Sequence, residues 1–469
     1  MTGEPRPRGY RNGELSHWLC SAGQTAPTRP PLPGPRETDI AVVGGGFTGL
    51  WAAYALRRRA PERSVTVLEA EHVGFGASGR NGGWLSHLVP GNRARYAAGP
   101  GGHAATTRLQ AALVAAIDEV LAACAREGID AGQHRGGQLT VATTRAGLHR
   151  LRADRAADLR FGLRPDESEL LDAGAVRDRI EVTGAVGGLV HPMVVRVDPA
   201  KLVTGLAAAV ERLGGVIHER TRVLAVGSGR VWTDRGELTA GSVLVCTEGY
   251  GGPLLGRRSI IPINSSMIVT EPLAPADWAR IGWVGRECLN DAAHTFVYAQ
   301  RTADDRIAIG GRGRPYRFGS GIGARGTTHP RTVAELTARL RTFFPGVPFE
   351  VAHAWSGVLG VTRDWCATVR YDADRGLGVA TGYAGHGVTA AHLAGSTLAD
   401  LVLGRESELV GLPWVDHRSP RWEPEPARWL GVHGMYRLFR LADAWEERRG
   451  AEHTSLLARI GGKLAGLSE

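Results

Sequence analysis

Four residues near the N-terminus have the spacing that binds the phosphates and a ribose of a dinucleotide. Gly44, Gly46 and Gly49 form a G-x-G-x-x-G sequence, and Glu69 lies 20 residues after Gly49. The first glycine permits a tight turn, the second lets backbone amides approach a pyrophosphate, and the third lets a helix pack closely on its strand. A carboxylate at the position of Glu69 accepts hydrogen bonds from a ribose diol. The spacing therefore predicts a dinucleotide site.

A strand, a helix and a second strand must hold these residues in place. Residues 39–43 are apolar and rich in β-branched side chains, as in a buried parallel strand. Residues 50–59 suit a helix whose N-terminal amides face the phosphates, and residues 65–68 suit a second strand that ends at Glu69. Because the strand, turn, helix, second strand and acid follow one another at the expected spacing, we favour a dinucleotide site over the alternative, a glycine-rich turn without a ligand.

Two further glycine-rich segments indicate which dinucleotide is bound. Residues 74–83 read Gly-Phe-Gly-Ala-Ser-Gly-Arg-Asn-Gly-Gly, and residues 382–388 read Gly-Tyr-Ala-Gly-His-Gly-Val before a predicted helix over 389–403. An NAD-binding domain normally continues from the acid into another helix and strand. A run of small residues at this point indicates instead a backbone wrapped closely around a larger cofactor.

These two glycine loops resemble those of the flavin-dependent amine and amino-acid oxidoreductases, the family of D-amino-acid oxidase, glycine oxidase and sarcosine oxidase. Residues 77–83 are most similar to the gamma-glutamylputrescine oxidase branch, and the resemblance covers about residues 36–405. It implies FAD and oxidation of the C–N bond of a primary or secondary amine or amino acid. A hydride passes to flavin N5, the imine hydrolyses, and O2 or another acceptor reoxidises the flavin. The protein then mainly orients substrate and tunes the cofactor.

The resemblance also implies which residues lie beside FAD, and that the helix after the third loop stabilises negative charge on the reduced flavin. The implied neighbours are Gly44, Gly46, Phe47, Thr48, Gly49, Glu69, Ala70, Ser78, Gly79, Asn81, Gly82, Gly83, Val223, Thr247, Gly385, His386, Gly387, Val388 and Thr389. Some relatives attach flavin through a cysteine shortly before the aspartate equivalent to Asp364, and others through a histidine in the second glycine loop. Here Cys366 follows that aspartate and the loop has no histidine, so we expect non-covalent FAD.

Three residues are candidates for the substrate site. Sarcosine-oxidase-like members hold the substrate carboxylate with a lysine where this chain has Thr389. Arg312, after the predicted strand 305–310, is our first candidate for an anion clamp, although a surface arginine explains it equally well. Arg80 is the second candidate. Tyr298, on the predicted strand 295–300, either lines the pocket or packs within the sheet.

The expected fold is a two-domain α/β flavoprotein, because 469 residues exceed one ordinary domain. A Rossmann-like FAD-binding domain would accompany a substrate domain with a mixed or antiparallel sheet. The expected divisions are an N-terminal arm over 1–36, the FAD-binding domain over 37–92, 166–258 and 352–405, the substrate domain over 93–165 and 259–351, and a helical tail over 406–469.

Composition limits the possible partners. The net charge of +9 comes from basic residues that mix with acids rather than cluster, which indicates solvated faces and no nucleic-acid partner. The five cysteines lie far apart without a C-x-x-C pair, so we expect a reducing cytoplasm and no metal site. No run of 18 apolar residues exists, and we expect no membrane partner. Oligomeric state stays open.

Two other functions remain open at this stage. One is a FAD-dependent dehydrogenase of a hydroxy acid or polyol, which would use the same cofactor site. The other is a flavin-binding scaffold without turnover, in which the terminal segments would bind partners. The behaviour of the flavin toward amines and hydroxy acids distinguishes these functions from amine oxidation.

Overall fold

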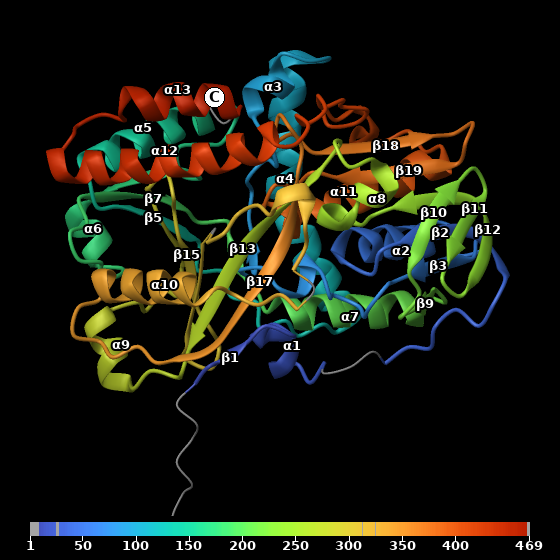
Figure 1. The fold of residues 1–469 in the computed structure, drawn as a ribbon, viewed down its shortest axis with the longest axis horizontal. Helices are drawn as coiled ribbons and strands as arrows, with labels where there is room; N and C mark the ends of the chain where they lie inside the picture. Colours follow the sequence, from blue (N-terminus) through green and yellow to red (C-terminus); the bar gives the residue numbers. More distant parts are fainter. Residues whose placement is uncertain (1–8, 25–27, 312, 324, 467–469) are drawn as a thin grey trace, which may run out of the picture.

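Two large sheets organise the protein (Figure 1). The computed structural model describes residues 9–24, 28–311, 313–323 and 325–466. One sheet has eight strands and the other has nine, and a small two-stranded sheet joins β4 (Trp84–Leu85) to β8 (Val195–Arg196). This mixed α/β architecture with a largely parallel sheet and a largely antiparallel sheet agrees with the predicted fold class.

The eight-stranded sheet has a parallel centre. β2 (Arg36–Val43) pairs in parallel with β3 (Val65–Leu68) and with β12 (Gly236–Val245), and β9 (Val216–His218) and β19 (Leu377–Thr381) extend this parallel set. The end of β2 and all of β3 are buried, as expected for strands covered on both faces. The remaining strands, antiparallel to their neighbours, are β10 (Val223–Gly227), β11 (Arg230–Thr233) and β18 (Thr368–Asp372).

Helices cover the parallel sheet, and two of them cross at very short range. The helices are α2 (Phe47–Arg59), α4 (Gly102–Glu127), α7 (Pro199–Arg212) and α11 (Gly387–Leu403). A Cβ built at Gly395 of α11 would lie 2.6 Å from the backbone nitrogen of Ala52 in α2 and 2.8 Å from the Cβ of Trp51. Only glycine therefore permits this approach, which sets α11 against the helix that follows the first glycine loop.

The nine-stranded sheet has two different faces. Its longest pair of strands is β13 (Ile261–Thr270) with β17 (Val351–Val361). The order is β1 (Arg11–Asn12), β17, β13, β16 (Ile307–Gly311), β15 (Tyr298–Arg301), β14 (Cys288–Asp291), β5 (Gln138–Ala142), β7 (Gly187–His191) and β6 (Glu169–Asp172). Ile268, Leu289 and Ile309 on one face pack in an apolar core with residues of α9 (Pro275–Ile281) and α10 (Pro330–Phe343). Tyr298 lies opposite the polar residue Asn290 in the ladder, and side chains opposite each other share a face. The other face of the sheet therefore carries both of them.

The structure differs from the expected domain divisions and from one expected strand. We placed residues 166–258 in the FAD-binding domain, whereas β6 and β7 lie in the nine-stranded sheet. Strand β15 begins at Tyr298 rather than at Thr295. Asp443 accepts hydrogen bonds from the backbone nitrogens of His294 and Thr295, which draws these two residues out of the ladder.

Both terminal segments pack on the body. β1 adds in parallel to β17, and α1 (His17–Ser21) buries Trp18 and Leu19. At the other end, α12 (Ala427–Arg449) and α13 (Leu456–Ala465) form a helical pair over α5 (Arg145–Arg160) (Figure 1). Among the described helices, none has the length and apolar character required to cross a membrane.

We predict that Gly395→Val destabilises the protein by about 3 kcal/mol, because its Cβ meets backbone atoms of α2 that cannot move independently. Denaturant unfolding followed by circular dichroism measures this loss. The matched control is Gly431→Val in α12, where an added Cβ has no neighbour within 4 Å. Equal stability of the two variants would contradict the proposed helix crossing.

Candidate functional site

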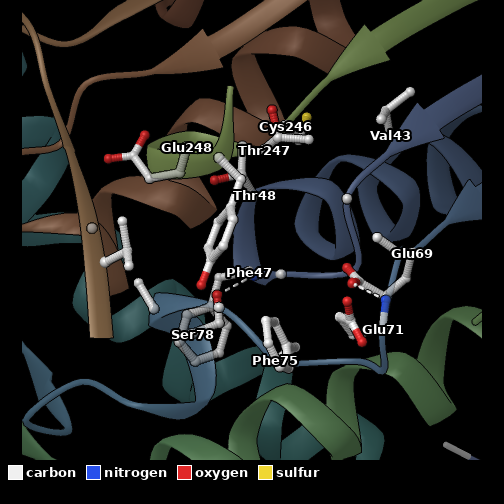
Figure 2. A pocket seen from close by; sticks show the side chains of 18 of the residues that line it. Val43, Phe47, Thr48, Glu69, Glu71, Phe75, Ser78, Cys246, Thr247 and Glu248 are labelled. Carbon is white, nitrogen blue, oxygen red and sulfur yellow. Dashed lines mark hydrogen bonds between the residues drawn. The ribbon is translucent and has the colours of Figure 1, made fainter. Parts of the chain in front are cut away.

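A cavity of about 550 Å³ opens where β2, β3 and β12 end (Figure 2). Ligands of open α/β sheets bind at the carboxyl ends of the strands, and the volume lies within the usual range for small-molecule sites. Of the predicted cofactor neighbours, the following line it: Gly44, Gly46, Phe47, Thr48, Glu69, Ala70, Ser78, Asn81, Val223, Thr247, Gly385, Gly387 and Val388. The structure thus brings all three glycine loops to one cavity.

The first glycine loop leaves no room for side chains. Gly44 has a φ of +113°, and a Cβ there would lie 2.7 Å from the carbonyl oxygen of Cys246. A Cβ on Gly49 would lie 2.0 Å from the carbonyl oxygen of Gly44, and one on Gly46 would lie 2.9 Å from Ser78 Oγ. The backbone at the N-terminus of α2 therefore lies at the cavity wall, where Phe47 N donates to Ser78 Oγ at 2.8 Å, and the absence of glycine side chains permits the close approach of a pyrophosphate to this turn.

Glu69 ends β3 beside this loop. Its carboxylate accepts hydrogen bonds from the backbone nitrogens of Gly45 (2.8 Å) and Glu71 (2.9 Å). Loss of water around the carboxylate raises the pKa of Glu69 to about 7, and the two amides oppose this rise only in part. Each oxygen keeps a further lone pair for a hydroxyl donor, so the group can bind a ribose diol.

Glu248 is a second carboxylate at the cavity wall, and we did not predict it. It accepts hydrogen bonds from Gly382 N (2.9 Å), Tyr383 N (3.2 Å), Gly360 N (3.2 Å) and Thr381 Oγ1 (3.0 Å). Burial raises the pKa of Glu248 to about 7. This side chain ties β17 to the third glycine loop. The sequence did contain a signal for Glu248, since it is an acid that closely follows the strand ending before Thr247.

The second glycine loop is held from outside the cavity. Ser16 Oγ donates to the carbonyl of Gly79, and the indole nitrogens of Trp18 and Trp355 donate to the carbonyls of Asn81 and Arg80, both at 2.9 Å. The N-terminal arm and β17 therefore fix three consecutive carbonyl groups of this loop.

Three glycines of the second loop shape its packing and do not line the cavity. A Cβ on Gly79 would lie 2.4 Å from the carbonyl oxygen of Gly74. On Gly82 it would lie 2.9 Å from the ring of Tyr298, and on Gly83 it would lie 2.2 Å from the carbonyl oxygen of Val197. These positions let the loop pass between the sheet and the cavity.

The third glycine loop carries the N-terminus of α11 to the cavity. His386 precedes the first residue of the helix, while Gly385, Gly387 and Val388 line the wall. Thr389 does not line the wall, and its buried hydroxyl has no hydrogen-bond partner among the described residues. The buried hydroxyl of Thr247 is equally unpartnered within that part of the chain, and Thr247 does line the cavity. A buried hydroxyl usually has a partner, so Thr247 fits a polar group of a bound ligand.

Arg80 does not present its charge to the cavity. Its guanidinium donates to the backbone carbonyls of Glu14 (2.7 Å), Phe75 (2.8 Å) and Ser356 (3.4 Å), and it lies over the ring of Phe75. Burial lowers the pKa of Arg80. The side chain links the N-terminal arm to the second glycine loop. An anion clamp would instead have to lie on the cavity wall.

Tyr298, another substrate candidate, is not on the cavity wall either. The hydroxyl of Tyr298 lies 3.0 Å from Ser265 Oγ, and its ring packs edge-on against Trp84 with centroids 6.1 Å apart. Arg312 lies outside the described residues. The wall also contains apolar and aromatic residues that sequence spacing did not reveal, among them Phe75, Tyr250, Leu254, Val358, Leu359 and Tyr383.

Taken together, these features fit FAD. The glycine cradle and the N-terminus of α2 suit a pyrophosphate, Glu69 suits a ribose, and the unpartnered hydroxyl of Thr247 offers a further polar contact. The apolar wall suits a large ring system.

Comparisons with known proteins agree with this assignment. The family model DAO, FAD dependent oxidoreductase, matches residues 39–401. Gamma-glutamylputrescine oxidoreductase of Escherichia coli (strain K12) is 31% identical over 402 residues, covering 83% of this chain and 89% of that protein. Glycine oxidase of Geobacillus kaustophilus is 25% identical over 389 residues, covering 79% and 94%. The crystal structure of that glycine oxidase superposes with a TM-score of 0.67 and 21% identity over 81% of this chain and 99% of that one.

We predict that Gly46→Val weakens FAD binding about 100-fold, which corresponds to roughly 2.7 kcal/mol, because its side chain meets Ser78 and covers the amides at the start of α2. Titration of the cofactor-free protein with FAD, followed by flavin fluorescence, gives the affinity. Gly411→Val, where an added Cβ meets nothing within 4 Å, should bind FAD normally. Retention of FAD by Gly46→Val would refute the placement of the pyrophosphate.

A second prediction concerns pH. The pKa of Glu69 is about 7, and only the ionised carboxylate accepts hydrogen bonds from both ribose hydroxyls. FAD affinity should therefore rise about tenfold from pH 6 to pH 8, as the ionised fraction rises. Glu69→Gln should bind more weakly at pH 8 and lose this dependence, whereas Glu248→Gln should keep it. The same pH slope in wild type and Glu69→Gln would contradict the role of this carboxylate.

Proposed function

Since the chain belongs to the family of FAD dependent oxidoreductases, we propose that it oxidises the C–N bond of a primary or secondary amine or amino acid. One observation carries this proposal: a cavity with a complete dinucleotide cradle continues into a wall of apolar and aromatic side chains. The two relatives described above are named for acting on an acylated diamine and on an amino acid, which supports an amine as the substrate class.

Bound FAD would supply the acceptor for a hydride from the carbon next to the amine nitrogen. The chain supplies binding and orientation. Backbone groups at the start of α2 hold negative charge at one end of the cavity, and the N-terminus of α11 favours negative charge at the third glycine loop. Val358, Leu359 and Tyr383 exclude water from the wall beside that loop.

Two carboxylates of the cavity, those of Glu69 and Glu248, are already engaged mainly by the backbone, and a third, that of Glu71, pairs with Arg222 at 2.6 Å, which suits a reaction without a dedicated base. Glu69 and Glu248 together accept six hydrogen bonds, five of them from backbone nitrogens. An amine that binds as the free base needs no protein group to remove a proton before hydride transfer. The imine product would hydrolyse in water, and O2 or another acceptor would take up the two electrons removed from the amine.

We also propose that FAD is held without a covalent bond. Cys366 is fully buried, its thiol points to the backbone oxygen of Asn92, and it does not line the cavity. Burial raises the pKa of this thiol to about 12, which disfavours the nucleophilic thiolate. Acid precipitation should accordingly release all of the flavin into the supernatant.

We predict that an amine or amino acid bleaches the flavin under anaerobic conditions and yields a carbonyl product. Polyamines, N-acylated diamines and amino acids should be screened by the loss of flavin absorbance, with carbonyl and amine or ammonia assays, and air admitted afterwards to test O2. Bleaching by hydroxy acids or polyols alone would indicate a dehydrogenase of those compounds. A flavin that no amine reduces would indicate a scaffold and contradict the proposal.

A further inference from the structure

Exposed apolar side chains gather on the C-terminal helical pair. Twelve large hydrophobic side chains are exposed in the described part of the chain, and six of them lie on α12 and α13. These six are Leu430, Leu441, Trp445, Leu456, Leu457 and Ile460. Of the other six, Leu224 and Trp232 lie on the paired strands β10 and β11, and the remaining four lie in separate segments of the chain. Single exposed hydrophobic residues are ordinary, whereas such a concentration marks an interaction surface.

Five of these residues lie toward the connection between the two helices, and we call them the C-terminal apolar face: Leu441, Trp445, Leu456, Leu457 and Ile460. The two helices are in contact, because a Cβ on Gly461 would lie 2.9 Å from Leu438 Cδ2 and 3.1 Å from Met435 Sδ. The chain reverses over residues 450–455, so the start of α13 lies beside the end of α12 (Figure 1). Leu441 and Trp445 are spaced by four on α12, and Leu456 and Ile460 are spaced by four on α13, so each of these two pairs shares one side of its own helix.

Contacts on the opposite side of α12 fix this orientation. Glu446 is buried and pairs with Arg150 at 2.7 Å and with His294 at 3.1 Å. Asp443 accepts hydrogen bonds from the backbone of residues 294 and 295. The last turns of α12 therefore direct Asp443 and Glu446 toward the body, where Phe439 also stacks on His294, and leave Leu441 and Trp445 exposed.

Positive charge surrounds the apolar face. The exposed basic residues of the two helices are Arg437, Arg440, Arg448, Arg449, Arg459 and Lys463. Only two exposed acids, Glu447 and Glu452, are described between residues 427 and 466, and Glu452 pairs with Arg145 at 3.0 Å. Arg440 in turn lies 3.8 Å from Glu335, and the remaining excess of cations favours an anionic partner.

We propose that the C-terminal apolar face binds an anionic lipid surface. Leucine, isoleucine and tryptophan side chains on an exposed face, bordered by arginine, are the pattern of a helix that lies in a membrane interface. Cations near the surface add attraction to anionic headgroups. A symmetric contact with a second copy of the chain would instead bring the same positive border against itself, which is repulsive.

This proposal revises the expectation of no membrane partner, which rested on the lack of a spanning segment. A surface helix needs no such segment, and α12 and α13 lie outside residues 39–401 that the family model matches. The proposal is independent of the substrate, because the helical pair does not line the FAD cavity.

Co-sedimentation of the FAD-loaded protein with vesicles tests the proposal. It should bind vesicles of phosphatidylcholine with phosphatidylglycerol and not phosphatidylcholine alone, and raised salt should weaken binding. Leu457→Glu should lower binding about tenfold, and Arg448→Gln with Arg449→Gln should lower it selectively on anionic vesicles. The matched control is Val284→Glu, which changes the most exposed hydrophobic residue elsewhere (84% exposed) and should bind normally.

Flavin content and thermal unfolding of each variant show whether it is folded. Three outcomes would overturn the proposal: no binding to either kind of vesicle, equal binding with and without phosphatidylglycerol, or a Leu457→Glu variant that binds as wild type does. Light scattering that reveals a dimer dissociated by Leu457→Glu would also overturn it and assign the face to a second copy.

Discussion

The structure depends on the close approach of α2 to the end of β2. The Cα of Gly49 is so near the carbonyl of Gly44 that no side chain fits between them, and Gly395 brings α11 equally close to the other side of α2. These contacts set the position of the amides that face the cavity. Because interiors are close-packed and stiff, a displacement of α2 would move both the first and the third glycine loops.

Carboxylates hold the loops around the cavity, and backbone amides hold the carboxylates. Glu69 joins the first glycine loop to the end of β3, and Glu248 joins β17 to the third loop. Loss of water on burial raises the pKa of each of these two carboxyl groups to about 7. Hydrogen bonds, rather than a cation, hold each side chain in place. The positive charge of Arg222, which also lines the cavity, is paired with Glu71 and takes no part in holding these two carboxylates.

The terminal segments take different roles. The N-terminal arm is part of the cofactor site. Ser16 and Trp18 donate hydrogen bonds to carbonyls of the second glycine loop, and Arg80 of that loop donates one to the carbonyl of Glu14. The C-terminal helices are anchored through Asp443 and Glu446 and leave an apolar surface with a positive border outside. One terminus thus completes the interior, and the other presents a surface for contact.

The sequence by itself determined the cofactor site wherever the signal is local. The spacing of Gly44, Gly46 and Gly49, and an acid placed at the end of the second strand, report steric and hydrogen-bond requirements that act within about 30 residues. The two-domain α/β class followed from the same patterns. Tertiary structure alone decided the rest, because contacts between distant segments leave no fixed spacing. It turned Arg80 away from the cavity, placed Glu248 in its wall and moved β6 and β7 into the nine-stranded sheet.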